Sequence, residues 1–179
     1  MAPGTGPGCD SGPAPARTLP AMVELSESVL VEASLAETWN FYFDPRGWPV
    51  WVDGFQSVVS DQGYPEEGGT LVWRSTPAGR GEVSERVIEH EERRRHRIEF
   101  SDPASSGRLL SEFAIEGEGT RVSLMLEYGL TRSGPFAWLT DRLFVRGQVR
   151  QSLARSLLRF KHEAEEAAHF ADHAPSPDR

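Results

Sequence analysis

The sequence has little cysteine and no long apolar run. Cys9 is the only cysteine among 179 residues, so an internal disulfide is excluded and nothing in the chain calls for an oxidising compartment. No stretch approaches the roughly 18 apolar residues of a membrane span, and residues 1–20 lack the basic start and apolar core of a secretory signal. We therefore expect a cytoplasmic protein without integral membrane association.

Positive charge and nucleotide-binding motifs are scarce as well. The formal net charge is −8 and Lys161 is the only lysine. Because binding to nucleic acid needs a positive field, we predict no nucleic-acid partner. A P-loop, a dinucleotide fingerprint, a nucleophile elbow and a zinc motif are absent, which argues against phosphotransferases, oxidoreductases and hydrolases. Glu166 and His169 have a Glu-x-x-His spacing, but one copy on one helix is too little for a bridged metal site. We expect no metal and no cofactor.

The composition divides the chain into one domain and two tails. Residues 1–21 are rich in Gly, Pro and Ala, and 173–179 resemble them. Such segments cannot bury enough apolar surface to offset their ordering entropy, so we predict disordered tails around a single domain at 22–172. Met22 opens the patterned part of the chain, which leaves either Met1 or Met22 as the natural start.

The first part of this domain predicts a strand and two short helices. Residues 23–31 alternate between apolar and polar, as in a half-buried strand. Ser34 and Glu37 then form a capping-box pattern, which predicts a helix over about 35–43 that ends before a proline. Trp48 and the proline after it can begin a second short turn of helix.

The rest of the domain predicts six strands and a long helix. Turn-forming residues separate expected strands at about 55–60, 69–76, 80–90, 94–101, 107–117 and 120–130, and the short connections imply an antiparallel meander. From Gly134 to about Ala171 apolar residues recur at helical spacing. We predict an α+β fold: a curved seven-stranded antiparallel sheet wrapped around a long C-terminal helix, in the order β-α-α-β6-α. This geometry favours a cavity between sheet and helix.

This pattern resembles the START-like, or SRPBCC (helix-grip), superfamily and its polyketide cyclase/dehydrase and lipid-transport-like branch. The stretches that carry the resemblance are VLVEASLAETWNFYFDPRGWPVWVDGF, YPEEGGTLVW, EGEGTRVSLMLEY and LLRFKHEAEEA. The resemblance implies a deep, mostly apolar pocket enclosed by the sheet and the helices. Members include lipid carriers, hormone receptors, aromatase/cyclases and quinone-binding proteins, so the fold implies a pocket and leaves the reaction open.

Trp48 and Trp51 lie among two prolines and two glycines in FDPRGWPVWVDGF. The resemblance places this stretch near the pocket entrance, so both are candidate ligand-binding residues. The alternative is that Trp51 anchors the short helix in the core and Trp48 only covers the surface. We expect Trp48→Ala to weaken ligand binding with little loss of melting temperature.

Further pocket candidates lie on the strands and the long helix. An ordinary core would use the same residue types, and the sequence does not separate a filled core from a hollow one. Gly147 lies inside the predicted long helix, where glycine lowers stability by about 0.5–1 kcal/mol relative to alanine. Its missing side chain would leave room for a ligand or permit close helix–sheet packing. With Gly147, these candidates are Trp73, Phe113, Tyr128, Phe136 and Leu143.

Several charged residues fall on predicted strands. Glu27 lies in the apolar phase of its strand, and a buried carboxylate needs a partner or a raised pKa, so it is a candidate site residue with Arg74 or Arg97 as partner. The alternative is a solvated Glu27 on a frayed strand. The run RRRHR (93–97) follows EHEE and is expected to form a solvated, mutually paired turn. Other charged strand residues are Glu85, Arg86, Glu99 and Glu112.

Three functions follow from these observations. The first is binding of a small hydrophobic or aromatic ligand, such as a lipid, a polyketide or a quinone-like molecule, in the expected cavity. The second is a polyketide aromatase/cyclase-like enzyme that uses Tyr, Arg and Glu side chains of the pocket. The third is a protein-interaction module without a ligand. The sequence leaves monomer and homodimer open.

Overall fold

Seven antiparallel strands form one curved sheet in the computed structural model, which describes residues 22–77, 79–130 and 145–172. The order across the sheet is β1-β7-β6-β5-β4-β3-β2, so the first strand closes against the last and the others follow as a meander. The strands are β1 (Val23–Val31), β2 (Phe55–Gln62), β3 (Thr70–Ser75), β4 (Glu82–Glu91), β5 (Arg95–Ser101), β6 (Ser105–Glu116) and β7 (Gly119–Leu130).

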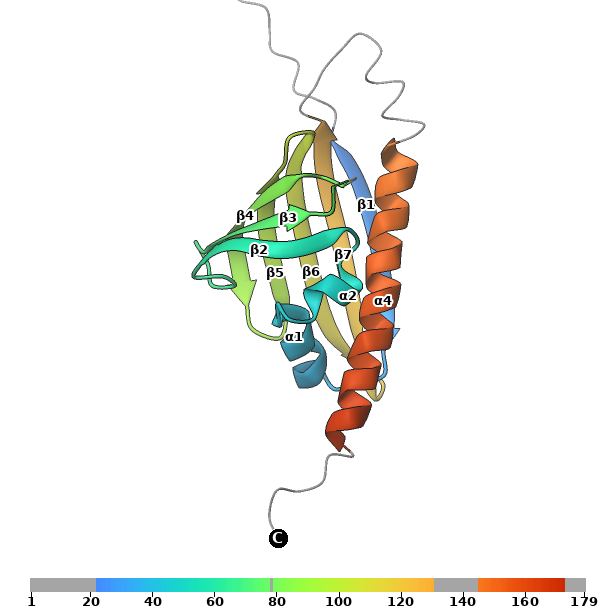
Figure 1. Cartoon of the computed structure of the whole chain (residues 1–179). Helices are drawn as coiled ribbons and strands as arrows, with labels where there is room; N and C mark the ends of the chain where they lie inside the picture. Colours follow the sequence, from blue (N-terminus) through green and yellow to red (C-terminus); the bar gives the residue numbers. More distant parts are fainter. Residues whose placement is uncertain (1–21, 78, 131–144, 173–179) are drawn as a thin grey trace, which may run out of the picture.

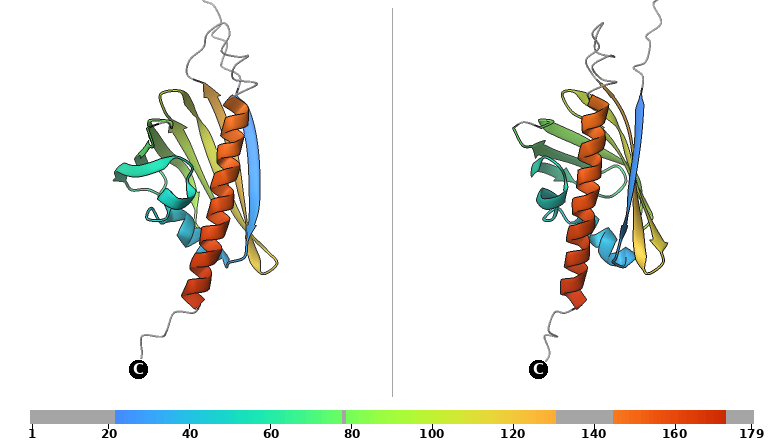
Figure 2. Two further views of the ribbon diagram at one scale, coloured as in Figure 1. Left: turned by 45° about the vertical axis from the view of Figure 1, so that its right-hand side comes forward. Right: turned by 90° about the vertical axis from the view of Figure 1, so that its right-hand side faces the viewer.

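Three helices accompany the sheet in the described part of the chain. The two short ones, α1 (Leu35–Phe43) and α2 (Trp48–Trp51), connect β1 to β2, and the long α4 (Arg146–Asp172) comes last. Figures 1 and 2 show α4 running beside β1 along the length of the sheet, with α1 and α2 near one end of it. The predicted fold class is confirmed. The strand ends differ from the expected ones by one or two residues, and the predicted tails at 1–21 and 173–179 lie outside the described residues.

The helix signals in the sequence act as expected. The Ser34 hydroxyl accepts a hydrogen bond from the Glu37 backbone N–H, and the Glu37 carboxylate accepts one from the Ser34 N–H, so the capping box is present. On α4 the apolar stripe is buried at Leu157, Phe160 and Ala164. The expected start of this helix near residue 134 lies outside the described residues. Among those described, no helix combines the length and the hydropathy that crossing a bilayer requires.

The two tryptophans of α2 are both buried, with 6% of each exposed. Trp48 donates its indole N–H to the Tyr42 carbonyl at 2.9 Å and packs edge-on against Phe55 and Tyr64. Trp51 packs against Tyr42 and Phe160, with ring centroids 5.2 and 5.1 Å away. The prolines and glycines therefore allow the irregular backbone of this short segment, and the two indole rings pack into the core and hold the segment in place.

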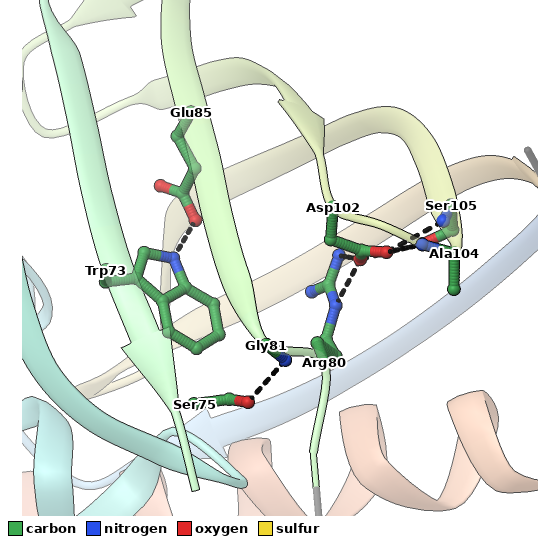
Figure 3. A network of polar contacts seen from close by, with 8 residues as sticks. All are labelled: Trp73, Ser75, Arg80, Gly81, Glu85, Asp102, Ala104 and Ser105. Carbon is green, nitrogen blue, oxygen red and sulfur yellow. Dashed lines mark hydrogen bonds and ion pairs between the residues drawn. The ribbon is translucent and has the colours of Figure 1, made fainter. Parts of the chain in front are cut away.

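An ion pair joins two turns at the other end of the sheet. Arg80, between β3 and β4, donates through Nε to the Asp102 carboxylate at 2.7 Å. The same carboxylate accepts hydrogen bonds from the backbone N–H groups of Ala104 and Ser105 and from the Ser105 hydroxyl (Figure 3). The Asp102 side chain is 1% exposed. Burial alone raises the pKa of Asp102, but Arg80 and these hydrogen bonds outweigh it and hold the pKa below its usual value.

The burial of Trp48 changes the expectation for its removal. Trp48→Ala empties a packed site and orphans the Tyr42 carbonyl, so it should lower the free energy of unfolding by about 3–5 kcal/mol. Urea denaturation measures this, with Val50→Ala on the exposed side of α2 as the matched control. The control should change stability by less than about 0.5 kcal/mol. A loss below about 1 kcal/mol for Trp48→Ala would contradict the packing described here.

Asp102→Asn should lower the free energy of unfolding at pH 7 by about 3 kcal/mol, because Arg80 and two backbone donors lose their charged acceptor. Since the pKa of Asp102 is lower in the folded state, its contribution is complete above about pH 4, the unfolded-state value, and is lost as the pH falls through the folded-state pKa.

Denaturation of wild type and Asp102→Asn between pH 7 and pH 3.5 measures this dependence. The difference in free energy of unfolding between wild type and Asp102→Asn should become smaller as the pH falls toward 3.5. Glu116→Gln, which breaks the exposed pair with Arg121, is the control and should change the free energy of unfolding far less than Asp102→Asn does, because water screens an exposed pair. Equal losses in both variants would show that the Asp102 pair does not join the turns.

Candidate functional site

A cavity of about 690 Å³ lies between the inner face of the sheet and the helices α2 and α4. Strands β3 to β7 supply most of its wall, because the inward residues of each strand alternate with outward ones. The volume falls within the range typical of small-molecule sites. The lining is mostly apolar and aromatic, and includes Leu71, Ile98, Phe100, Leu124, Leu126 and Leu153.

The end of the cavity beside α1 carries polar groups that stay neutral at ordinary pH. The Tyr42 hydroxyl and the Ser111 hydroxyl are 2.7 Å apart and buried. Burial raises the pKa of Tyr42 to about 12, against a smaller opposing effect of the hydrogen bond with Ser111. Burial also raises the pKa of Tyr64, and the charge of Glu85 adds to this. These phenols can donate hydrogen bonds but resist ionisation.

Two histidines meet at the same end. His90 Nδ1 and His96 Nδ1 are 3.0 Å apart, between the rings of Phe43 and Tyr64. His96 is 2% exposed, and burial, together with the neighbouring His90, lowers its pKa to about 3. Its Nε2 is buried and has no hydrogen-bond partner in the described part of the chain. His96 is therefore a neutral ring on the cavity wall.

A carboxyl group lies on the middle of the inner face. Glu85 is the inward residue between Val83 and Val87 on β4, and its Oε1 accepts a hydrogen bond of 2.7 Å from Trp73 Nε1 on β3 (Figure 3). In the sheet register Leu71 faces Glu85 and Trp73 faces Val83, which makes Trp73 and Glu85 diagonal neighbours. Burial raises the pKa of Glu85, and the hydrogen bond from Trp73 and the charge of Arg80 offset only part of this.

The cations on the described cavity wall are both paired. Arg80 is held by Asp102, and its guanidinium lies 4.8 Å from the ring centroid of Phe100. Arg155 on α4 donates to Asp53 at 2.8 Å, which lowers the pKa of that carboxyl. Glu85 is the described lining carboxyl without an ion pair.

Four predicted site residues line this cavity, namely Trp48, Trp51, Trp73 and Tyr128. Trp48 packs in the core and also lines the cavity, so a packing role does not exclude contact with a ligand. Trp51 Nε1 is buried without a hydrogen-bond partner among the residues described. Their proposed contact with a ligand stays a prediction.

Two other candidates, Phe113 and Glu27, lie off the cavity wall. Phe113 is buried behind the wall, between Trp39 and Tyr42. Glu27, on the edge strand β1, is not among the residues of the cavity wall, and its carboxylate accepts a hydrogen bond of 2.9 Å from Arg150 Nε of α4. The expected partners were wrong: Arg74 pairs with Glu82 and Arg97 with Glu89.

The glycine on the long helix does not face the cavity either. Gly147 is exposed, and a Cβ added there would meet no described atom within 4 Å, so no described part of the sheet packs closely against it. Gln148 and Gln151 line the cavity in its place. Phe136 and Leu143 lie outside the described residues.

Sequence reasoning missed the most distinctive polar wall groups. Glu85, like Glu27, lies in the apolar phase of its strand, which places its side chain on the inner face. The alternation of His96, Ile98 and Phe100 with polar residues likewise indicates that His96 points inward. The expectation of a solvated paired turn over 93–97 holds for Arg94, which pairs with Glu91, and fails for the buried His96. Within residues 22–77, 79–130 and 145–172, no three His, Cys, Asp or Glu side chains gather as metal ligands.

Solved structures share this architecture at low sequence identity. The Zhui aromatase/cyclase from Streptomyces sp. R1128 is 15% identical with a TM-score of 0.68, over 81% of this chain and 94% of its own. A protein from Thermus thermophilus is 24% identical with a TM-score of 0.63, over 82% and 99%. Truncated norcoclaurine synthase from Thalictrum flavum is 14% identical with a TM-score of 0.58, over 79% and 94%. At these identities the likeness establishes the fold alone.

The comparison with family models assigns the chain to a family, which the comparison with solved structures does not. No curated protein sequence matches the chain. The family model described as polyketide cyclase/dehydrase and lipid transport matches residues 22–165, which include every strand of the sheet and most of α4. With the sheet, the long helix and the cavity between them, the chain belongs to the polyketide cyclase/dehydrase and lipid transport family of the SRPBCC superfamily.

Proposed function

We propose that this protein binds a small hydrophobic or aromatic molecule in the cavity between the sheet and α4. The observation that carries the proposal is the cavity of about 690 Å³ with its mostly apolar wall. Each CH₂ group of a ligand transferred into such a wall contributes about 0.8 kcal/mol. A lipid, a polyketide or a quinone-like molecule has the required apolar surface, and the few polar wall groups would orient it.

A polyketide aromatase/cyclase-like activity is the second candidate. A specific observation favours it: Glu85, with a raised pKa, shares the cavity wall with Tyr42 and Tyr64. A carboxyl group whose pKa moves toward neutral pH is suited to proton transfer, and the phenols can stabilise a developing enolate by donating hydrogen bonds. Native mass spectrometry of the purified protein, with extraction of whatever co-purifies, would identify a carried ligand or product.

A protein-interaction module has less support. A closed, well-filled core would have favoured an interaction module, because a domain without a cavity has no internal site for a ligand. The cavity supports the two ligand hypotheses instead.

Filling part of the cavity should weaken ligand binding without unfolding the protein. Leu126 is a half-buried wall residue on β7, and Leu126→Trp would occupy cavity volume. Met125, its neighbour on the opposite face, is 38% exposed, so Met125→Trp is the matched control. In a fluorescence titration with the neutral naphthyl ketone dye prodan, Leu126→Trp should weaken binding at least about tenfold, or 1.4 kcal/mol, while Met125→Trp should bind like wild type. Equal binding by both variants would place the dye outside the cavity and overturn the proposal.

A further inference from the structure

The carboxyl group of Glu85 is held in one orientation. Its Oε1 accepts the hydrogen bond of 2.7 Å from Trp73 Nε1. Among the residues that the structure describes, no hydrogen bond involves its Oε2, and Glu85 lines the cavity. Figure 3 shows one oxygen at the indole and the other turned away from it.

This orientation decides where the proton of Glu85 resides. An oxygen that accepts from an indole N–H is a poor place for a proton, so a protonated Glu85 carries it on Oε2. Burial favours that protonated form by raising the pKa. Glu85 then offers an O–H donor to the cavity, and a donor inside an apolar wall selects a ligand that brings an acceptor.

The surrounding charges favour a neutral acceptor over an anion. The lining cations that are described, Arg80 and Arg155, are occupied by Asp102 and Asp53. An anionic ligand would therefore be desolvated without a free counter-charge. Arg80 acts directly on the charge of Glu85. The other titratable or charged groups on the described cavity wall are Tyr42, Asp53, Tyr64, His96, Asp102, Tyr128 and Arg155.

We propose that the ligand is an aromatic ketone or quinone whose neutral carbonyl oxygen accepts a hydrogen bond from Glu85 Oε2, with its rings against the aromatic wall beside Trp73. This inference rests on the proposed binding function and adds the chemical class of the ligand. It also makes binding pH-dependent, because an ionised Glu85 has no proton to donate and repels a carbonyl oxygen.

Two probes of nearly equal size test the inference by calorimetry between pH 5 and pH 9. They are 2-acetylnaphthalene and 2-ethylnaphthalene, in which CH₂ replaces the carbonyl. At the acidic end wild type should bind the ketone about 5- to 10-fold more tightly than the hydrocarbon, the value of one hydrogen bond. The preference should disappear as the pH rises through the pKa of Glu85. The pKa values of Tyr42, about 12, and of His96, about 3, keep both outside this range.

Three variants assign the effect to Glu85. Glu85→Gln can still accept from Trp73 and donate through its amide, so it should keep the ketone preference and lose the pH dependence. Glu85→Met should bind both probes alike at every pH. Glu99→Gln, on the outward face of β5 where Glu99 pairs with Arg108, is the control and should behave as wild type.

The outcomes separate this inference from the function on which it rests. If wild type binds neither probe, the proposed binding function fails and the inference fails with it. If wild type binds both probes equally at every pH, the inference is overturned while the binding function stands. The ratio of the wild-type affinities for the two probes, measured across the pH range, tests the inference even if the Glu85 variants do not fold.

Discussion

Helices α1, α2 and α4 meet at Phe160. This side chain of α4 is fully buried and lies against Phe41 and Tyr42 of α1 and Trp51 of α2, with ring centroids 5.1–5.8 Å away. Aromatic side chains bury large areas and prefer the tilted and edge-on contacts seen here. The junction ties the helices to one end of the curved sheet. Further along α4, Leu153 and Val149 are only half-buried and line the cavity, so the same helix that closes one end leaves the rest of the inner face hollow.

The polar groups of the cavity follow from the cost of burying charge. A buried ion is tolerated when it is paired and hydrogen-bonded, as Asp102 is with Arg80. The half-buried Asp53 is paired with the exposed Arg155. Burial disfavours the charged forms of the groups without an ion pair: it raises the pKa of Glu85 and lowers that of His96. The described wall therefore carries little net charge although five of its residues are Asp, Glu or Arg. Such a wall suits uncharged molecules with one or two hydrogen-bonding groups.

Local patterns predicted the elements because local rules govern them. Alternation marked the strands, the capping box started α1, the proline after Asp44 ended it, and the helical stripe on α4 identified its buried face. These signals depend on residues a few positions apart. The neighbours from β2 to β7 followed from short connections, which favour antiparallel pairing, whereas the pairing of β1 with β7 joins strands far apart in the chain.

The site was predicted less well because its members come from strands far apart in the chain. Glu27 and Glu85 both occupy the apolar phase of a strand, yet Arg150 reaches Glu27 at the edge strand β1, whereas Glu85 on β4 accepts its hydrogen bond from Trp73. Nothing local distinguishes these carboxylates, since their partners lie on other elements. The sequence by itself determined the strands, the helix caps and the family. Tertiary structure alone decided which side chains face a hollow interior, because the gap between a curved sheet and a straight helix depends on how both pack.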